Sequence, residues 1–227
     1  IAVAARIVAR SVNLDAVAAA AAPIGSPGQT RPLPPLGGRI ALACDAAFAF
    51  AYPHMLADWR AAGAEILPFS PLCDEAPDAA ADAVFLPGGY PELHAGRLSD
   101  AARFRAGMRA AAARGAAIYG ECGGYMTLGE GLVDAEGRRH AMLGLLPLQT
   151  SFAETRRSLG YRRLAPRAGA PWQGPLAGHE HHRATILAEG EATRLFDVTD
   201  AAGVPLQPMG LRVGRVCGSF AHVIAPM

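Results

Sequence analysis

Short apolar runs alternate with amphipathic stretches from residue 39 to residue 119. Four apolar runs predict buried strands, at residues 39–44, 64–69, 83–86 and 116–119. Two amphipathic stretches predict helices, at residues 52–62 and 100–114. The second helix is expected to begin at Ser99 or Asp100, which are good N-cap residues, and to end at Gly115. Strands that alternate with helices through short turns are typical of a mostly parallel sheet with helices on both faces.

The pattern changes after residue 144, where the expected helices disappear. The apolar segments that follow predict further strands, at residues 145–152, 160–164, 176–186 and 209–224. We expect them to form an antiparallel extension of the sheet. The predicted fold class is therefore α/β, with a C-terminal antiparallel β extension.

The first residues differ from the rest of the chain. Residues 1–20 have helical character, but no partner element follows them, and residues 23–38 are rich in proline and glycine. We expect residues 1–22 to be the tail of a preceding domain, residues 23–38 to be a linker, and residues 39–227 to be the main domain. Because the sequence begins with Ile1 rather than Met, we also expect it to be part of a longer protein.

Composition excludes several classes of function. The 227 residues are 51% hydrophobic and 18% charged, and the formal net charge is +1, so nothing favours nucleic acid or a membrane as a partner. The four cysteines are scattered, without a Cys-x-x-Cys pair. That arrangement argues against a disulfide framework and favours a cytoplasmic location.

One cysteine lies in a setting that favours a nucleophile. The predicted strand ending at Tyr119 runs directly into Gly-Glu-Cys-Gly-Gly, with a helix-compatible stretch after Cys122. Glycines permit a tight strand-to-helix turn and the close approach of a substrate. The helix N-terminus favours a thiolate, so we expect the pKa of Cys122 to be below that of a free thiol. The alternative is that Cys122 is a small buried hydrophobic residue, as most free cysteines are.

A cysteine nucleophile needs a base, and His222 is the best candidate. It follows an apolar run that reads as a strand end, and the glycine loop at residues 87–89 also follows a predicted strand. The ends of parallel strands share one edge of the sheet, so we expect these groups to meet there. The segment Gly-His-Glu-His-His at 178–182 could offer a His-x-His metal pair, but no third ligand accompanies it, and we expect no metal.

Four segments resemble one enzyme family, in the family's order. They are Tyr-Gly-Glu-Cys-Gly-Gly-Tyr-Met at 119–126, Leu-Pro-Gly-Gly-Tyr-Pro-Glu at 86–92, Gly-His-Glu-His-His-Arg at 178–183 and Gly-Ser-Phe-Ala-His at 218–222. Together they resemble the glutamine amidotransferase domain of cobyrinic acid (or hydrogenobyrinic acid) a,c-diamide synthases. Residues 7–15 also resemble the last helix of that family's N-terminal ATP-dependent domain, whose phosphate loop Gly-x-x-x-x-Gly-Lys-Ser/Thr does not occur in this sequence.

The resemblance implies a fold, a reaction and partners. The fold would be that of class I glutamine amidotransferases, a flavodoxin-like sheet. Cys122 would attack the side-chain amide of glutamine and form a thioester, His222 would transfer protons, and the amides of Gly89 and Gly123 would stabilise the oxyanion. No cofactor is implied for this chain. ATP and Mg²⁺ are expected in the N-terminal domain, where ammonia would amidate a corrinoid precursor, and a homodimer is left open.

Two positions depart from the wider class I pattern. Met126 stands where Gln usually follows Gly-x-Cys-x-Gly, and Ile224 stands where an acid usually follows the histidine by two residues. Either the site works as a Cys–His dyad or another acid orients His222, with Glu180 as our candidate. Glu180 could instead face the substrate.

Three alternative functions remain open from the sequence. A cysteine hydrolase or peptidase of the same fold would also need Cys122 and His222. A noncatalytic tetrapyrrole-binding module would not need a cysteine among glycines. A flavodoxin-like nucleotide binder would need a phosphate loop after its first strand, where this chain has the apolar Asp-Ala-Ala-Phe-Ala-Phe at residues 45–50.

Overall fold

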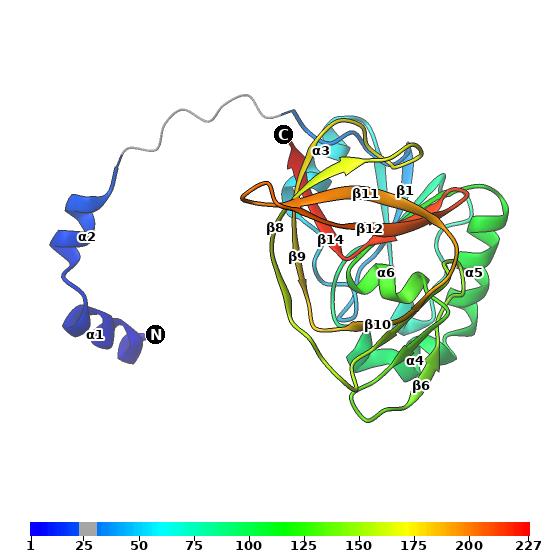
Figure 1. Ribbon diagram of the computed structural model, residues 1–227, viewed down its shortest axis with the longest axis horizontal. Helices are drawn as coiled ribbons and strands as arrows, with labels where there is room; N and C mark the ends of the chain where they lie inside the picture. The colour runs from blue at the N-terminus through cyan, green and yellow to red at the C-terminus, as the bar shows by residue number, and fades with distance from the viewer. Residues whose placement is uncertain (23–30) are drawn as a thin grey trace. The chain divides into compact units, whose positions relative to one another are not determined.

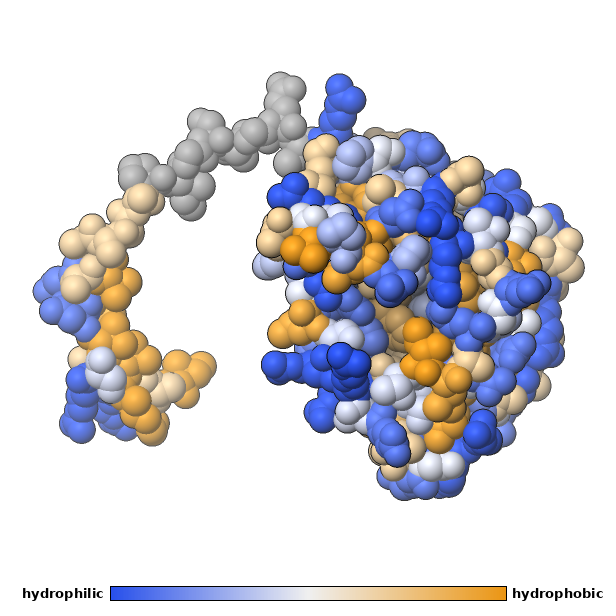
Figure 2. All heavy atoms as spheres, in the orientation of Figure 1, coloured by the Kyte–Doolittle hydropathy of each residue, from blue (hydrophilic) through white to orange (hydrophobic). Residues whose placement is uncertain are grey.

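A computed structural model describes residues 1–22 and 31–227, which divide into two compact units, Ile1–Thr30 and Arg31–Met227 (Figure 1). Helices α1 (Ala2–Ser11) and α2 (Leu14–Ala20) form the described part of the first unit, so the helical character of residues 1–20 is confirmed. Neither helix has a buried residue, and Figure 2 shows apolar side chains along this unit. Amphipathic helices without a buried face lack the packing that usually stabilises such elements.

Part of the predicted linker belongs to the second unit. Leu33 is buried, and the carbonyl oxygen of Pro34 accepts a hydrogen bond of 2.8 Å from Nε1 of Trp172. The compact unit therefore begins at Arg31, ahead of the predicted start at residue 39. Residues 23–30 of the predicted linker lie outside the described residues.

A ten-stranded sheet organises the second unit, and half of it is parallel. Its parallel strands, in spatial order, are β2 (Glu65–Phe69), β1 (Arg39–Ala43), β3 (Ala83–Leu86), β4 (Ala117–Glu121) and β13 (Val216–Ser219). Side chains alternate between the two faces, so Ile40 and Phe85 pack in one core while Ala41 and Val84 pack in the other.

Helices cover both faces of the parallel strands, as predicted. Helix α3 (Pro53–Ala61) packs Met55 and Trp59 into one core. Helices α4 (Ala95–Asp100), α5 (Ala102–Ala113) and α6 (Gly123–Leu128) contribute to the other core (Figure 1). The expected helix at 100–114 starts later, at Ala102, with Ala101 as its N-cap rather than Ser99 or Asp100. Asp74 supplies the missing cap from another element, because its Oδ1 accepts a bond of 2.9 Å from the Phe104 amide.

The predicted antiparallel extension is confirmed. Its strands, in spatial order from β13, are β12 (Pro205–Val213), β11 (Thr193–Asp200), β8 (Ser158–Pro166), β9 (Leu176–His182) and β14 (Ala221–Pro226). The sheet curls so far that β14 returns to β4. The amide of Val223 donates a hydrogen bond of 3.0 Å to Oε1 of Glu121, although five strands separate β14 from β4 in the sheet order.

Part of the predicted extension belongs to a second sheet, and several short elements were not predicted. A second sheet contains β10 (Thr185–Glu189), β7 (Leu148–Ser151), β5 (Gly131–Val133) and β6 (Arg139–Ala141), and two short 3-10 helices are η1 (Pro71–Cys73) and η2 (Pro91–His94). The predicted strand at 145–152 contains β7, so it belongs to this second sheet rather than to the extension of the first. The predicted strand at 176–186 covers all of β9 and the start of β10, and β11 falls in no predicted segment. Strands of three residues, such as β5 and β6, are too short to show an alternation.

Candidate active site

Cys122 occupies a strained turn between β4 and α6. Its φ of 47° is positive, a conformation that costs a non-glycine residue free energy and recurs at nucleophiles. The turn fits tightly against the end of β3, because a Cβ atom at Gly124 would overlap with the Leu86 carbonyl oxygen. The backbone amide of Cys122 donates a hydrogen bond of 2.8 Å to the carbonyl oxygen of Ser219 at the end of β13. The neighbouring strands therefore hold the cysteine in this unfavourable conformation.

The thiol of Cys122 is buried and uncharged at rest. The residue is 5% exposed, and Sγ lies 3.7 Å from the carbonyl oxygen of His181, to which the thiol donates. Burial raises the pKa of Cys122 to about 12; the Gly123 amide opposes this, while the charges of Glu92, Glu121 and Glu180 add to it. The expectation of a lowered pKa is therefore wrong. Helix α6 has only six residues. The stabilisation that its N-terminus gives to a thiolate does not outweigh the cost of burying the charge.

His222 lies at the same edge of the sheet, on β14. It is 3% exposed, and its ring stacks on that of His179, the residue opposite it on β9, with the ring centroids 4.7 Å apart. Burial, followed by the charges of His179, His181 and His182, lowers the pKa of His222 to about 4. A neutral imidazole can accept a proton, so this histidine is suited to act as a base.

The predicted glycine loop borders the histidine and the cysteine turn. A Cβ atom at Gly88 would collide with Cε1 of the His222 ring, and one at Gly123 would lie 3.0 Å from the backbone nitrogen of Gly89. The loop also contacts the turn directly, since the Gly124 amide donates a bond of 3.1 Å to the Pro87 carbonyl oxygen. The structure therefore brings together Cys122, His222, Gly89 and Gly123. No hydrogen bond joins Sγ of Cys122 to His222 in the described part of the chain.

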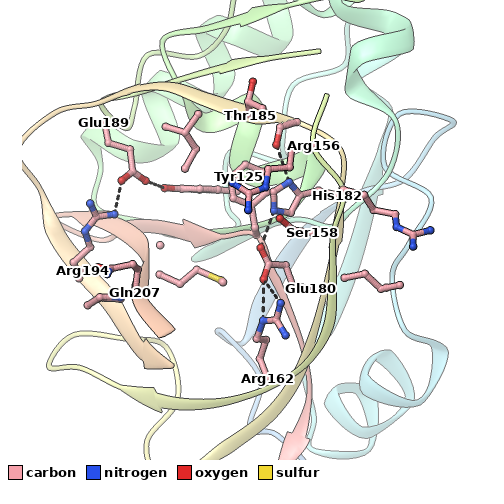
Figure 3. A pocket seen from close by; sticks show the side chains of 18 residues that line it. Tyr125, Arg156, Ser158, Arg162, Glu180, His182, Thr185, Glu189, Arg194 and Gln207 are labelled. Carbon is pink, nitrogen blue, oxygen red and sulfur yellow. Dashed lines mark hydrogen bonds and ion pairs between the residues drawn. The ribbon is translucent and has the colours of Figure 1, made fainter. Parts of the chain in front are cut away.

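Glu180 does not orient His222. Its carboxylate accepts hydrogen bonds of 2.9 Å from Nε of Arg162 and 2.8 Å from Nε2 of His182 (Figure 3). Burial alone would raise the pKa of Glu180, but His182 and then Arg162 hold it below its ordinary value. Both oxygens of the carboxylate are therefore engaged away from His222. This corrects the pairing that we expected from the sequence.

The carboxylate beside His222 belongs to Glu121, a residue that the sequence analysis did not select. Its Oε2 lies 3.7 Å from Nδ1 of His222, and its Oε1 accepts from the Val223 amide at 3.0 Å. Glu121 is completely buried, and burial raises its pKa to about 8 against the opposing effects of the Val223 amide and the Tyr119 hydroxyl. One sequence feature could have identified Glu121 as a site residue: it is a charged residue at the end of an apolar strand, directly before Cys122.

Neighbours of Cys122 line two cavities. One of about 390 Å³ contains His222, His179 and His181, together with residues 49–52. The other, of about 840 Å³, contains Tyr125, Glu180 and His182, and four arginines carry positive charge around it: Arg156, Arg157, Arg162 and Arg194 (Figure 3). Both cavities have polar walls, and Cys122 itself lines neither of them.

Two histidines of β9 are engaged within the protein, and the third, His181, is exposed. Nε2 of His179 lies 2.5 Å from the Tyr52 hydroxyl, and His182 is bonded to Glu180. Within residues 1–22 and 31–227, no group of three or more His, Cys, Asp or Glu residues is placed to hold a metal ion. Every helix in these same ranges is too short or too polar to cross a bilayer.

Known proteins of high sequence identity share one name. The chain is 68% identical over 192 residues to a hydrogenobyrinate a,c-diamide synthase from Sinorhizobium sp, which covers 85% of this chain and 44% of that protein. It is 58% identical over 217 residues to the protein of the same name from Rhizobium meliloti (strain 1021), covering 96% of this chain and 51% of that protein. The chain thus spans about half the length of the curated relatives it matches.

Solved structures share the fold at low sequence identity. The structure of PurLQS from Thermotoga maritima matches with a TM-score of 0.57 and 16% identity, over 81% of this chain and 86% of that one. A crystal structure of a glutamine amidotransferase matches with a TM-score of 0.53 and 18% identity, over 82% of this chain and 90% of that one. The predicted class I amidotransferase fold is confirmed. Residues 39–226 match the family model for the CobB/CobQ-like glutamine amidotransferase domain, and the chain belongs to that family.

Proposed function

We propose that this chain is the ammonia-supplying half of an ATP-dependent corrinoid a,c-diamide synthase. The observation that carries the proposal is the meeting of a buried cysteine on a strained turn with a neutral histidine and a glycine loop at one edge of the sheet. The names of the relatives support the corrinoid as the acceptor of ammonia. ATP and Mg²⁺ would bind in the part of those relatives that this chain does not span.

The reaction begins with proton transfer from thiol to imidazole. A preformed thiolate–imidazolium pair is unfavourable at rest, because the pKa of Cys122 is about 12 and that of His222 about 4. His222 therefore accepts the thiol proton as sulfur attacks the side-chain amide carbon of glutamine. General base catalysis of this kind contributes about 10²–10⁴-fold to a rate. The amides of Gly89 and Gly123 stabilise the oxyanion.

The rest of the reaction has two stages, formation of a thioester and its hydrolysis. His222 returns its proton to the departing nitrogen, the C–N bond breaks, and ammonia leaves a thioester on Cys122. His222 next deprotonates a water molecule, which attacks the thioester carbon. Glutamate leaves, and the proton returns to the Cys122 sulfur. The ammonia reacts with an ATP-activated carboxylate of the corrinoid, at its a and c acetate side chains.

The larger cavity has positive charge that could bind the carboxylate of an amino acid. Glutamine carries an α-carboxylate, and Arg156 and Arg157 lie at the exposed side of the cavity. The carboxylates of Glu180 and Glu189 are already paired within the chain, with Arg162 and Arg194. A volume of about 840 Å³ is within the range of small-molecule sites.

Covalent labelling tests the proposal. A diazoketone analogue of glutamine should alkylate Cys122, and the Cys122→Ser variant should lose both labelling and ammonia release from glutamine. Cys217 is the matched control, because it is equally buried and burial raises its pKa to about 12 as well. Preferential labelling of Cys217, or unchanged ammonia release by Cys122→Ser, would contradict the proposal. Cleavage of peptide amides without hydrolysis of glutamine would favour a peptidase of the same fold.

A further inference from the structure

Two buried polar atoms face each other beside the proposed nucleophile. Oε2 of Glu121 and Nδ1 of His222 are 3.7 Å apart, and neither has a hydrogen-bond partner among the described residues. Unpaired buried polar atoms are unfavourable, so their presence needs a reason. A carboxylate and an imidazole nitrogen become a hydrogen-bonded pair when they approach by less than an ångström.

We propose that Glu121 positions His222, and that it is the acid of this site that stands in for the one missing after the histidine. This inference rests on the proposed function. The carboxylate accepts the Nδ1–H of His222, which leaves the Nε2 lone pair as the base for the Cys122 thiol. As His222 takes up the proton, the negative charge of Glu121 stabilises the imidazolium.

The backbone explains how an acid before the cysteine reaches the histidine. Glu121 is the last residue of β4 and lies opposite Ser219, the last residue of β13. His222 follows three residues later, as the second residue of β14. The bond from the Val223 amide to Oε1 fixes the carboxyl group, so Oε2 is left to face the ring. Glu121 and Cys122 are adjacent in the sequence, so the end of β4 positions both the acid and the nucleophile.

A purely structural role for Glu121 is the competing explanation. Its carboxyl group also holds β14 against β4 through Val223, and any substitution that loses this bond would disturb the fold. Glu121→Gln separates the two roles, because the amide oxygen can still accept from the Val223 amide. The amide nitrogen then faces Nδ1 of His222 as a donor. It would favour the Nε2–H tautomer, which has no lone pair for the thiol.

The titration of the pair takes place among several other groups. Those near Glu121 or His222 are Tyr119 on β4, Cys122, Tyr52 before α3, and His179, His181 and His182 on β9. Once Glu121 ionises, its carboxylate can accept hydrogen bonds but cannot donate them. The Nδ1–H tautomer of His222, which donates to this carboxylate, therefore becomes dominant. The pKa of Glu121 is raised to about 8, and turnover should therefore rise through that pH. This rise should disappear in Glu121→Gln.

The experiment measures tautomer and turnover in the 227-residue chain. Nitrogen-15 NMR of the histidine rings should show the Nδ1–H tautomer of His222 above about pH 8 in the wild type and the Nε2–H tautomer in Glu121→Gln. The variant should lose about 10²-fold in kcat with little change in KM, because the pair acts on the proton transfer. Glu121→Asp should recover part of the rate.

Asp134→Asn is the matched control. Asp134 is a buried acid that pairs with Nε2 of His140 at 2.8 Å in the second sheet, so the substitution breaks a similar pair elsewhere. It should leave kcat and its pH profile unchanged. A folded Glu121→Gln protein with wild-type kcat, pH profile and His222 tautomer would overturn the inference. If Glu121→Gln does not fold, an Nε2–H tautomer in the wild type above pH 8 would overturn it instead. Because the tautomer is read without turnover, absent glutaminase activity would count against the proposed function alone.

Discussion

Gly88 lies against the imidazole ring of His222, so closely that a Cβ atom at this position would overlap with Cε1. The ring is also stacked on His179, and it therefore has contacts on more than one side. Gly88 is needed here to leave room for a side chain of another strand, since its own φ is not in the left-handed region.

Gly88→Ala should therefore displace His222 and lower kcat for ammonia release by about 10²-fold or more, the effect of a misplaced catalytic group. Steady-state kinetics with circular dichroism as a check on folding would measure this. Gly96→Ala is the control, because its Cβ would meet only His140, at an ordinary 3.8 Å. That control should keep its activity. Equal kcat in Gly88→Ala and the wild type would show that the ring can move aside.

The strain at Cys122 predicts an unusual order of stabilities. Its positive φ is accessible to glycine but costly for alanine, so Cys122→Gly should be at least as stable as Cys122→Ala. At Cys217, on β13 and without a positive φ, the glycine variant should be less stable than the alanine variant by about 1 kcal/mol. Urea unfolding of the four variants would measure this. The same order at both positions would mean that the turn stores no strain.

The raised pKa of Glu121 predicts how stability depends on pH. From the ordinary value of 4.5 to about 8, the folded chain holds a proton that the unfolded chain has released. Stability therefore falls as pH rises, by at most about 1.4 kcal/mol per pH unit. Glu121→Gln cannot ionise, so its Tm relative to that of the wild type should rise from about pH 5 to about pH 8. A difference in Tm that does not change with pH would contradict the raised pKa.

His222 acts in the opposite direction at lower pH. Its pKa is lowered from 6.5 to about 4, so the unfolded chain binds the proton first as pH falls. The stability contributed by the neutral ring is present above 6.5 and is lost as pH falls through about 4. His222→Gln should therefore lose less Tm than the wild type between these two pH values. Parallel Tm curves for the two proteins would show that folding does not lower the pKa of His222.

The Arg162–Glu180–His182 group should matter more to stability than a surface ion pair. Its side chains are 12%, 10% and 8% exposed, so Glu180→Gln leaves a buried positive charge without its partner. We expect a loss of about 2 kcal/mol. Asp197→Asn, which breaks the exposed pair with Arg167, should cost much less. Labelling of Cys122 should persist in both variants, and equal losses of stability would contradict the importance of burial.

The sequence predicted the parts of the site that depend on local pattern. The apolar run before Gly-Glu-Cys-Gly-Gly indicated the strand that ends beside Cys122, and the strand signals before Gly88 and His222 indicated one shared edge. These signals are local in the sequence. The carboxyl ends of parallel strands lie at one edge of a sheet, so these signals also predict that the loops lie together. The cytoplasmic location and the homodimer stay predictions.

The rest of the site depends on long-range packing that no local pattern reports. Glu121 meets His222 because β13, which ends three residues before His222, pairs with β4, and these two strands are far apart in the sequence. Glu180 was preferred because it lies in a histidine-rich segment. In the structure its carboxylate instead accepts a hydrogen bond from Arg162 on the neighbouring strand. The pKa of Cys122 was predicted in the wrong direction because burial depends on every element around the turn.

The contact between β14 and β4 also has a consequence for synthesis of the chain. Cys122 leaves the ribosome about 100 residues before His222, which corresponds to roughly 5–20 s at ordinary rates of elongation. During that interval the nascent chain has its cysteine but neither the histidine nor the strand that covers it. Under the proposed function, an incompletely made domain cannot consume glutamine, and ammonia is released only by molecules whose chain has been made through β14.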